Sequence, residues 1–139
     1  MSDNDLDIRW IQRFNNFKKA LAQLEKFNAK KDLNELEDQG LIKAFEYTYE
    51  LSWKTLQDLL KEKGYTAIIG PKPVIEQSFQ DGVISDGEAW MRMHASRNLT
   101  SHIYNEETAG EIIEKIRNEY VDLFSVLKKS LEKIRDGNN

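Results

Sequence analysis

Apolar residues recur at spacings of three and four along most of this chain, a pattern typical of amphipathic helices. Between about Asp7 and Asn28 the apolar stripe consists of Trp10, Phe14, Phe17, Leu21 and Leu24. A longer stretch, from about Asn34 to Lys63, has the inward positions Leu41, Phe45, Trp53, Leu56 and Leu60. Lys61 and Lys63, followed by Gly64, suit a helix C-terminus. Cations are favourable at the negative end of the helix dipole, and glycine tolerates the left-handed conformation. Two long helices are predicted.

The second half of the chain predicts three further helices. The segment YTAIIGPKP contains both prolines, and Pro73 suits the first turn of a short helix over VIEQSFQDG. The stretch SDGE, residues 85–88, has the spacing of a capping box with Ser85 as its first residue, and predicts a helix through Arg97. The last helix could be capped by Asn105 or by the box that begins at Thr108. Its apolar positions are Ile113, Ile116, Tyr120, Leu123, Leu127, Leu131 and Ile134.

These elements predict an all-α, up-and-down bundle of four to five helices. The chain has 139 residues, with neither an internal repeat nor a linker, so we expect one domain over residues 1–139, with residues 1–6 as a flexible tail. It has no cysteine, which excludes disulfides and thiolate metal sites. Without a long apolar run or a basic leader, we expect a cytoplasmic protein with no membrane contact.

The charge balance restricts the function classes. The formal net charge is -4, from 20 basic and 24 acidic residues, which argues against broad non-specific nucleic-acid binding. A small basic cleft on an acidic body stays compatible with it. The chain lacks a glycine-rich phosphate loop, the Gly-Ser and paired-aspartate signature of a nucleotidyltransferase, and the Glu-x-x-His pattern of a metal-binding bundle. We therefore expect neither a metal nor a cofactor.

The stretch RNLTSHIY holds one of the two histidines. On a continuous helix, Arg97 and His102 would lie roughly 140° apart, and His102 and Tyr104 roughly 200° apart. If the helix stops near Ser101, the histidine and the tyrosine lie at a junction where an irregular backbone can bring them together. In a purely structural interpretation, Arg97 pairs with Glu106 or Glu107 and His102 is a satisfied polar group between helices.

The pattern Arg97-Asn98-x-x-x-His102-x-Tyr104 resembles the arginine–histidine motif of the HEPN superfamily, in the form with a tyrosine two places after the histidine. With FEYTYELSWKTLQDLL and GPKPVI upstream, nearly the whole chain resembles the HepT-type proteins, a group also labelled nucleotidyltransferase substrate-binding proteins. The resemblance implies a HEPN-like homodimer whose motifs face one cleft. It also implies a metal-independent ribonuclease, encoded beside a minimal nucleotidyltransferase that acts as its antitoxin.

Carried over by position, Arg97 and His102 would be the catalytic pair, Tyr104 the residue that receives AMP, and Asn98 a supporting residue. RNA cleavage needs proton transfer, and a free imidazole titrates near ~6.5. An arginine can bind two phosphate oxygens as charge develops. One histidine cannot readily act as both acid and base, so a second subunit would be part of the mechanism.

Two functions stay open. The first is a ribonuclease toxin of a type VII-like toxin–antitoxin pair, with RNA as substrate and the nucleotidyltransferase as partner. The second is a non-catalytic subunit that binds a nucleotide or presents a substrate to that partner. His94 matches no motif position, and we expect it to be structural. Tyr47, Tyr49 and Trp53 are expected to serve core and interface rather than base stacking.

Overall fold

The computed structural model describes residues 2–102 and 105–137, with side chains from residue 9 onward. These residues form helices and connecting turns and contain no strand. In chain order the helices are α1 (Ser2–Ala29), α2 (Glu35–Glu62), α3 (Pro71–Gln80), α4 (Gly87–Thr100), α5 (Glu106–Lys115), the π-helical segment η1 (Ile116–Tyr120) and α6 (Val121–Arg135).

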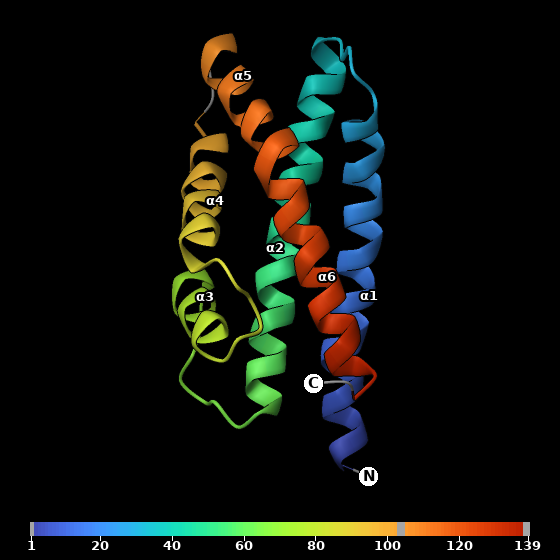
Figure 1. The fold of residues 1–139 in the computed structure, drawn as a ribbon, viewed down its shortest axis with the longest axis vertical. Helices are drawn as coiled ribbons and strands as arrows, with labels where there is room; N and C mark the ends of the chain where they lie inside the picture. The colour runs from blue at the N-terminus through green and yellow to red at the C-terminus, as the bar shows by residue number, and fades with distance from the viewer. Residues whose placement is uncertain (1, 103–104, 138–139) are drawn as a thin grey trace.

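The longer helices form rods that run alternately up and down (Figure 1). α1 and α2 form one antiparallel pair; α4 rises on the other side, and α5, η1 and α6 descend together as one tilted rod. The short α3 lies at the lower end, beside the beginning of α4. This arrangement confirms the predicted all-α up-and-down bundle.

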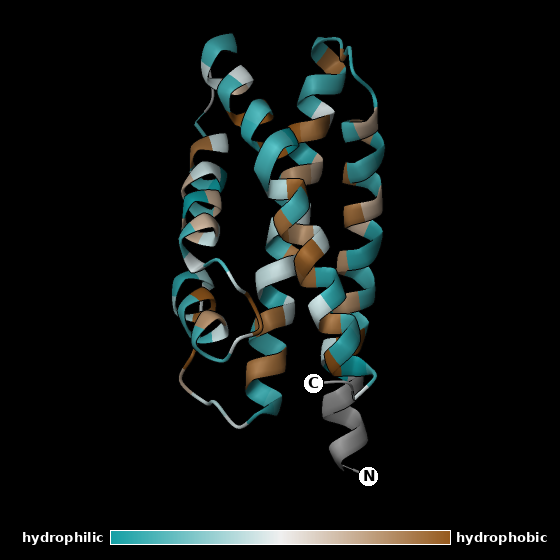
Figure 2. Cartoon of the chain, viewed as in Figure 1, coloured by the Kyte–Doolittle hydropathy of each residue, from teal (hydrophilic) through white to brown (hydrophobic). Residues whose placement is uncertain are grey.

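The core is built from the predicted apolar stripes. Figure 2 shows the brown, apolar positions on the inner sides of the rods and teal on the outer sides. All five α1 positions are buried, and in α2 four of five are, with Trp53 half-buried. The aromatic rings meet in the middle: Phe45 stacks on Tyr120 with centroids 5.5 Å apart, and Phe17 meets Phe124 edge-on. Such rings supply much of the apolar area that holds a bundle together.

Two helix starts differ from the predictions. α1 begins at Ser2 rather than near Asp7, because its apolar stripe starts only at Trp10 and could not locate the first turns. The predicted cap at Ser85 is wrong: Asp86 is the N-cap, and its carboxylate accepts a hydrogen bond from the Ala89 amide at 3.0 Å.

Of the two candidate caps for the last rod, Asn105 is the one used. Its side-chain oxygen accepts from the Thr108 amide at 2.8 Å. The second helix begins close to the predicted position near Asn34, where Asn34 and Glu37 form a reciprocal capping box that had not been predicted. The approximate start of a helix could therefore be recognised from a cluster of polar residues, but which of these residues is the N-cap could not.

The π-helical segment η1 was not predicted. A π-turn adds one residue to a helical turn and shifts the register of the residues after it. Tyr120, at its end, is fully buried, and its hydroxyl shares a 2.6 Å hydrogen bond with the Ser96 hydroxyl of α4. The segment therefore fastens the last rod to the helix that carries the RNLTSH stretch.

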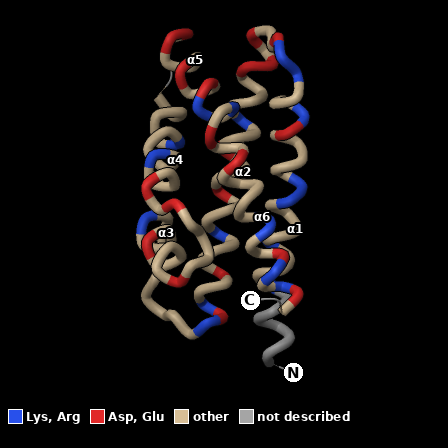
Figure 3. The backbone as a smooth tube through the Cα atoms, viewed as in Figure 1, with Lys and Arg blue, Asp and Glu red and all other residues tan. Residues whose placement is uncertain are grey.

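Charged residues occur along all the helices (Figure 3). The beginning of α5 is acidic, with Glu106 and Glu107 in its first turn, where carboxylates favour the positive end of the helix dipole. Within the described part of the chain, no helix combines the length and apolar character needed to cross a membrane.

Candidate functional site

α4 ends inside the RNLTSHIY stretch. Its last residue is Thr100, Ser101 is the C-cap, and the His102 amide donates to the Leu99 carbonyl at 2.9 Å. Of the two alternatives, a continuous helix and a stop near Ser101, the structure has the second, and the His102 side chain is exposed just beyond the helix. Tyr104 lies outside the described residues.

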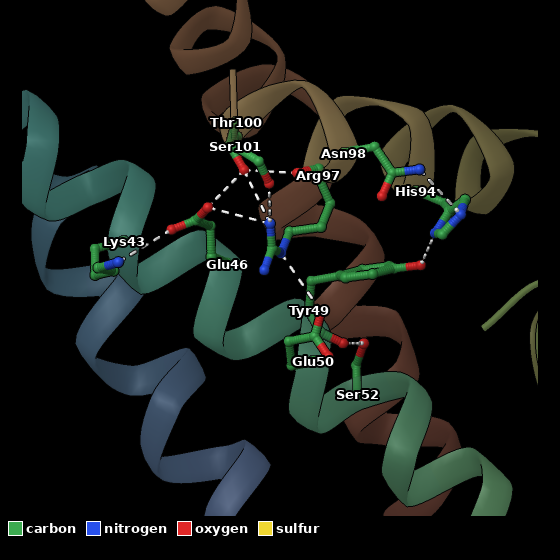
Figure 4. Close-up of polar contacts among 10 residues, drawn as sticks. All are labelled: Lys43, Glu46, Tyr49, Glu50, Ser52, His94, Arg97, Asn98, Thr100 and Ser101. Carbon is green, nitrogen blue, oxygen red and sulfur yellow. Dashed lines mark hydrogen bonds and ion pairs between the residues drawn. The ribbon is translucent and has the colours of Figure 1, made fainter. Parts of the chain in front are cut away.

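Arg97 stands in the last turn of α4 and reaches across to α2 (Figure 4). Its Nη1 donates to Glu46 Oε2 at 3.2 Å, and its Nε lies 3.5 Å from Glu50 Oε1. The Arg97 side chain is 23% exposed and that of Glu46 17%. The ion pair is thus largely shielded from water, which strengthens the attraction between the charges compared with a surface pair.

Two hydroxyl groups complete the surroundings of this arginine. Thr100 Oγ1 accepts from Arg97 Nη1 at 3.2 Å, and its one proton has two acceptors at 2.6 Å, Glu46 Oε2 and the Arg97 carbonyl oxygen. Ser101 Oγ accepts a longer bond from the same nitrogen, at 3.4 Å. The Glu46 carboxylate is therefore shared by two residues of the last turn of α4, and one side chain of α2 holds that turn.

The alternative partners considered for Arg97 were wrong. Glu106 and Glu107 belong to the first turn of α5, whereas the arginine turns the other way, toward the α2 carboxylates. Glu46 and Glu50 were missed as site residues. Their signal was two acids spaced one helical turn apart, inside a stretch otherwise rich in aromatic residues.

A second polar chain runs beside the first. Tyr49 is 1% exposed, and its hydroxyl shares a 2.7 Å hydrogen bond with Nδ1 of His94. The other ring nitrogen, Nε2, lies 3.4 Å from the amide nitrogen of Asn98 (Figure 4). If the proton of the neutral ring is on Nε2, Tyr49 donates to Nδ1, and Nε2 donates to the side-chain oxygen of Asn98 once that amide is flipped. If the proton is on Nδ1, the ring donates to the Tyr49 oxygen, and Nε2 accepts from the Asn98 side-chain nitrogen.

The protonation of this chain follows from its burial. Burial, reinforced by the Glu50 carboxylate, raises the pKa of the Tyr49 phenol well above its usual range, so the hydroxyl keeps its proton. Burial, and then the Lys72 ammonium, lower the pKa of His94, against a smaller opposing effect of Glu50. His94 is therefore a neutral imidazole near pH 7, and it links the core to the predicted supporting residue Asn98.

The predictions for the three aromatic residues have different outcomes. Tyr49 is a core residue, as expected. Trp53 is half-buried and packs against the core, while Tyr47 is 61% exposed on α2.

A hollow of about 750 Å³ lies between α3 and the beginning of α4, with Ile75 and Phe79 among its lining residues. Neither Arg97 nor His102 lines it; Arg97 is partly buried against α2, whereas His102 is exposed.

The arrangement can provide a cation held in place and an imidazole exposed to solvent. Arg97 and His102 both lie at the end of α4. Asn105, the N-cap of α5, follows three residues after the histidine. Among the described side chains, no group of three His, Asp or Glu residues is arranged to hold a metal ion. An arginine and an exposed imidazole are residue types suited to anion binding and to proton transfer.

Known proteins resemble this chain over different spans. A protein from Haemophilus influenzae named "Probable ribonuclease HepT" is 31% identical over 81 residues, which are 55% of this chain and 56% of that protein. The match thus covers only about half the length of that relative.

Two solved structures match over more of the chain. A protein from Thermus thermophilus is 32% identical, with a TM-score of 0.75, over 86% of this chain and 98% of the other. The second, from Haemophilus influenzae, was described as the fold of a substrate binding domain of a nucleotidyltransferase. It is 25% identical, with a TM-score of 0.66, over 94% of this chain and 98% of the other.

The family match spans most of the bundle. Residues 12–133 match the family described as "Nucleotidyltransferase substrate binding protein like", a range that runs from the first turns of the α1 stripe to the last turn of α6 and includes Arg97, Asn98 and His102. This chain belongs to the family of nucleotidyltransferase substrate binding protein-like proteins.

Proposed function

We propose that this protein is the toxin of a type VII-like toxin–antitoxin pair. In this proposal it is a cytoplasmic homodimer that cleaves RNA without a metal ion, and a minimal nucleotidyltransferase neutralises it by attaching AMP to Tyr104. The observation that carries the proposal is the end of α4, where a guanidinium held by Glu46 lies five residues before the exposed imidazole of His102. The name of the Haemophilus influenzae relative supports the same chemistry.

In the proposed reaction, the RNA 2′-oxygen attacks the neighbouring phosphorus. A histidine takes the proton of the 2′-hydroxyl, the bond from phosphorus to the 5′-oxygen breaks, and that oxygen receives a proton. The products are a 2′,3′-cyclic phosphate and a 5′-hydroxyl. Arg97 stabilises the negative charge on the non-bridging oxygens. A lysine could not replace it fully, because the planar guanidinium offers a pair of donors and an ammonium does not.

Each chain offers one His102, whereas the reaction needs an acid and a base. A homodimer with both motifs in one cleft supplies the second imidazole. The exposure of His102 on a single chain is compatible with a cleft that a second copy completes. General acid–base catalysis of this kind typically contributes ~10² to 10⁴ in rate.

The proposed switch acts on the same cleft. The Tyr104 phenolic oxygen attacks the α-phosphorus of ATP, pyrophosphate leaves, and the phenol loses its proton. The attached AMP places a phosphate anion and a nucleoside two residues from His102. That phosphate competes with RNA for Arg97 by charge, and the nucleoside occupies volume in the cleft.

The alternative function is a non-catalytic subunit that binds a nucleotide or presents a substrate to the nucleotidyltransferase. One observation favours it: two carboxylates, Glu46 and Glu50, lie beside Arg97 and offset its charge. The description of the second solved structure as a substrate binding domain points the same way.

Cleavage of a mixed RNA pool in EDTA separates the two functions. We expect the wild type to cut, and Arg97→Ala and His102→Ala to be inactive while remaining folded. If all three proteins are inactive, or all cut equally, the ribonuclease proposal fails. Intact-mass analysis after incubation with the nucleotidyltransferase and ATP tests the switch: we expect added AMP in the wild type and none in Tyr104→Phe.

A further inference from the structure

We infer that Glu46 is a positioning residue for the RNLTSH stretch: it holds the Arg97 guanidinium and the last turn of α4 in the orientation that substrate binding requires. This inference rests on the proposed role of Arg97. The glutamate lies on α2, about fifty residues from the motif in sequence, and its carboxylate is not placed to bind a phosphate itself, because both are anions.

The first argument is the sharing of one carboxylate oxygen. Glu46 Oε2 accepts from Arg97 Nη1 at 3.2 Å and from Thr100 Oγ1 at 2.6 Å. The two donors also contact each other at 3.2 Å, which closes a triangle of polar contacts. An arginine in a closed set of contacts loses its side-chain freedom before substrate binds. Less conformational entropy is then lost when the substrate binds.

The second argument is the position of this triangle in the chain. Thr100 is the last residue of α4, and the backbone leaves the helix at Ser101. Helix ends fray when their last turn has no tertiary contact. The contact between Thr100 and Glu46 ties this end to the middle of α2, so the direction in which the chain leaves toward His102 is set by the bundle.

The third argument is the part of the guanidinium that is engaged. The contacts to carboxylates use Nη1 and Nε. Among the residues that the structure describes, Nη2 has no hydrogen-bond partner, and this nitrogen is available for an anion. The carboxylates thus contact the guanidinium at Nη1 and at Nε, and Nη2 has no such contact with a described residue.

Glu50 contributes less to this arrangement. Its Oε1 lies 3.5 Å from Arg97 Nε, that nitrogen makes no hydrogen bond in the described structure, and the Glu50 side chain is 36% exposed. Glu50 therefore attracts the guanidinium without fixing its direction. Glu46 is the residue that combines charge, geometry and shielding from water.

The test compares Glu46→Ala and Glu46→Gln with a matched control, Arg13→Gln. The control removes another ion pair between helices, that of Arg13 Nε with Asp58 Oδ2 at 2.8 Å, at a site formed by α1 and α2 without the motif. Two readouts are used: kcat and KM for RNA cleavage in EDTA, and the NMR signal of the Arg97 Nε–H group, identified by its absence in Arg97→Lys.

For Glu46→Ala we expect kcat to fall by roughly 10- to 100-fold. KM should stay equal or decrease, because a negative charge near the phosphate site is removed. The Arg97 signal should move toward that of a free arginine side chain. Glu46→Gln retains an oxygen that accepts from Thr100, so its effect should be smaller. Arg13→Gln should lower the unfolding midpoint while leaving kcat and the Arg97 signal unchanged.

An unchanged kcat together with an unmoved Arg97 signal in Glu46→Ala would overturn the inference. If that variant does not fold, the same two readouts on Glu46→Gln decide, and no change in either has the same meaning. A wild-type protein that cuts no RNA, but whose Arg97 signal responds to Glu46→Ala and not to Arg13→Gln, would disprove the ribonuclease while leaving the positioning role intact.

Discussion

The Tyr49 hydroxyl lies 2.7 Å from Nδ1 of His94. This hydrogen bond connects a buried side chain of α2 with a half-buried side chain of α4. The rings themselves are 5.9 Å apart between centroids. Because the imidazole is engaged on one nitrogen by a core tyrosine and approaches Asn98 with the other, its orientation is determined by the bundle rather than by solvent. The neutral form suits this environment.

This environment predicts a pH-dependent stability. Since burial and Lys72 lower the pKa of His94 in the folded state, the unfolded chain binds a proton at this position more readily, with a pKa near 6.5. The free energy of unfolding should therefore rise with pH up to about 6.5, and decrease as the pH falls below it toward the folded-state pKa. Urea midpoints measured from pH 5 to 7.5 test this.

His94→Gln should remove that part of the slope, and Tyr49→Phe should retain it, since the imidazole stays half-buried beside Lys72. Equal slopes in the wild type and His94→Gln would show that other groups cause the pH dependence.

The hydrogen bond between Ser96 and Tyr120 predicts a strong coupling. Both side chains are buried, and the Tyr120 hydroxyl has one further, longer contact, to the Arg92 carbonyl at 3.4 Å. Ser96→Ala and Tyr120→Phe should each cost about 1–3 kcal/mol, because each leaves a buried hydroxyl without its main partner. The double variant should lose less than the sum, by about 0.5–3 kcal/mol in urea unfolding. Strict additivity would mean that the bond contributes nothing to the stability.

Hydrophobic spacing was sufficient for the fold and insufficient for the contacts of the site. The stripe from Trp10 to Leu24 was located correctly because a helix repeats every 3.6 residues, so local sequence determines which face is apolar. The contact of Arg97 with Glu46 joins residues 51 positions apart. No local rule relates them: their contact depends on how α4 packs against α2.

The π-helical turn before Tyr120 shows the same limit within one helix. The apolar spacing of the last rod was recognised, and Ile116, Leu127 and Leu131 are buried as expected. The π-turn, however, ends at Tyr120, whose hydroxyl bonds to Ser96 on another helix, and the periodicity of the rod does not reveal such a partner.

His102→Ala should separate catalysis from folding. The side chain is exposed at the end of α4, and surface replacements usually change stability by less than about 0.5 kcal/mol. We expect an unchanged thermal midpoint and an unchanged association state in sedimentation, with cleavage lost. A dissociated or destabilised variant would instead mean that the imidazole contributes to structure or assembly, and its catalytic assignment would be unsafe.

Two helical glycines should respond in opposite directions to alanine. At Gly110, in α5, an added Cβ would meet no atom within 4 Å, so Gly110→Ala should stabilise the protein by about 0.5–1 kcal/mol through helix propensity. At Gly40, in α2, the Cβ would lie 2.8 Å from two ring carbons of Phe27, which packs against the core. The ring must then move, and such overpacking costs about 1–3 kcal/mol. Urea unfolding of the two variants should place their midpoints on either side of the wild type; a stabilised Gly40→Ala would show that Phe27 can turn aside without loss of packing.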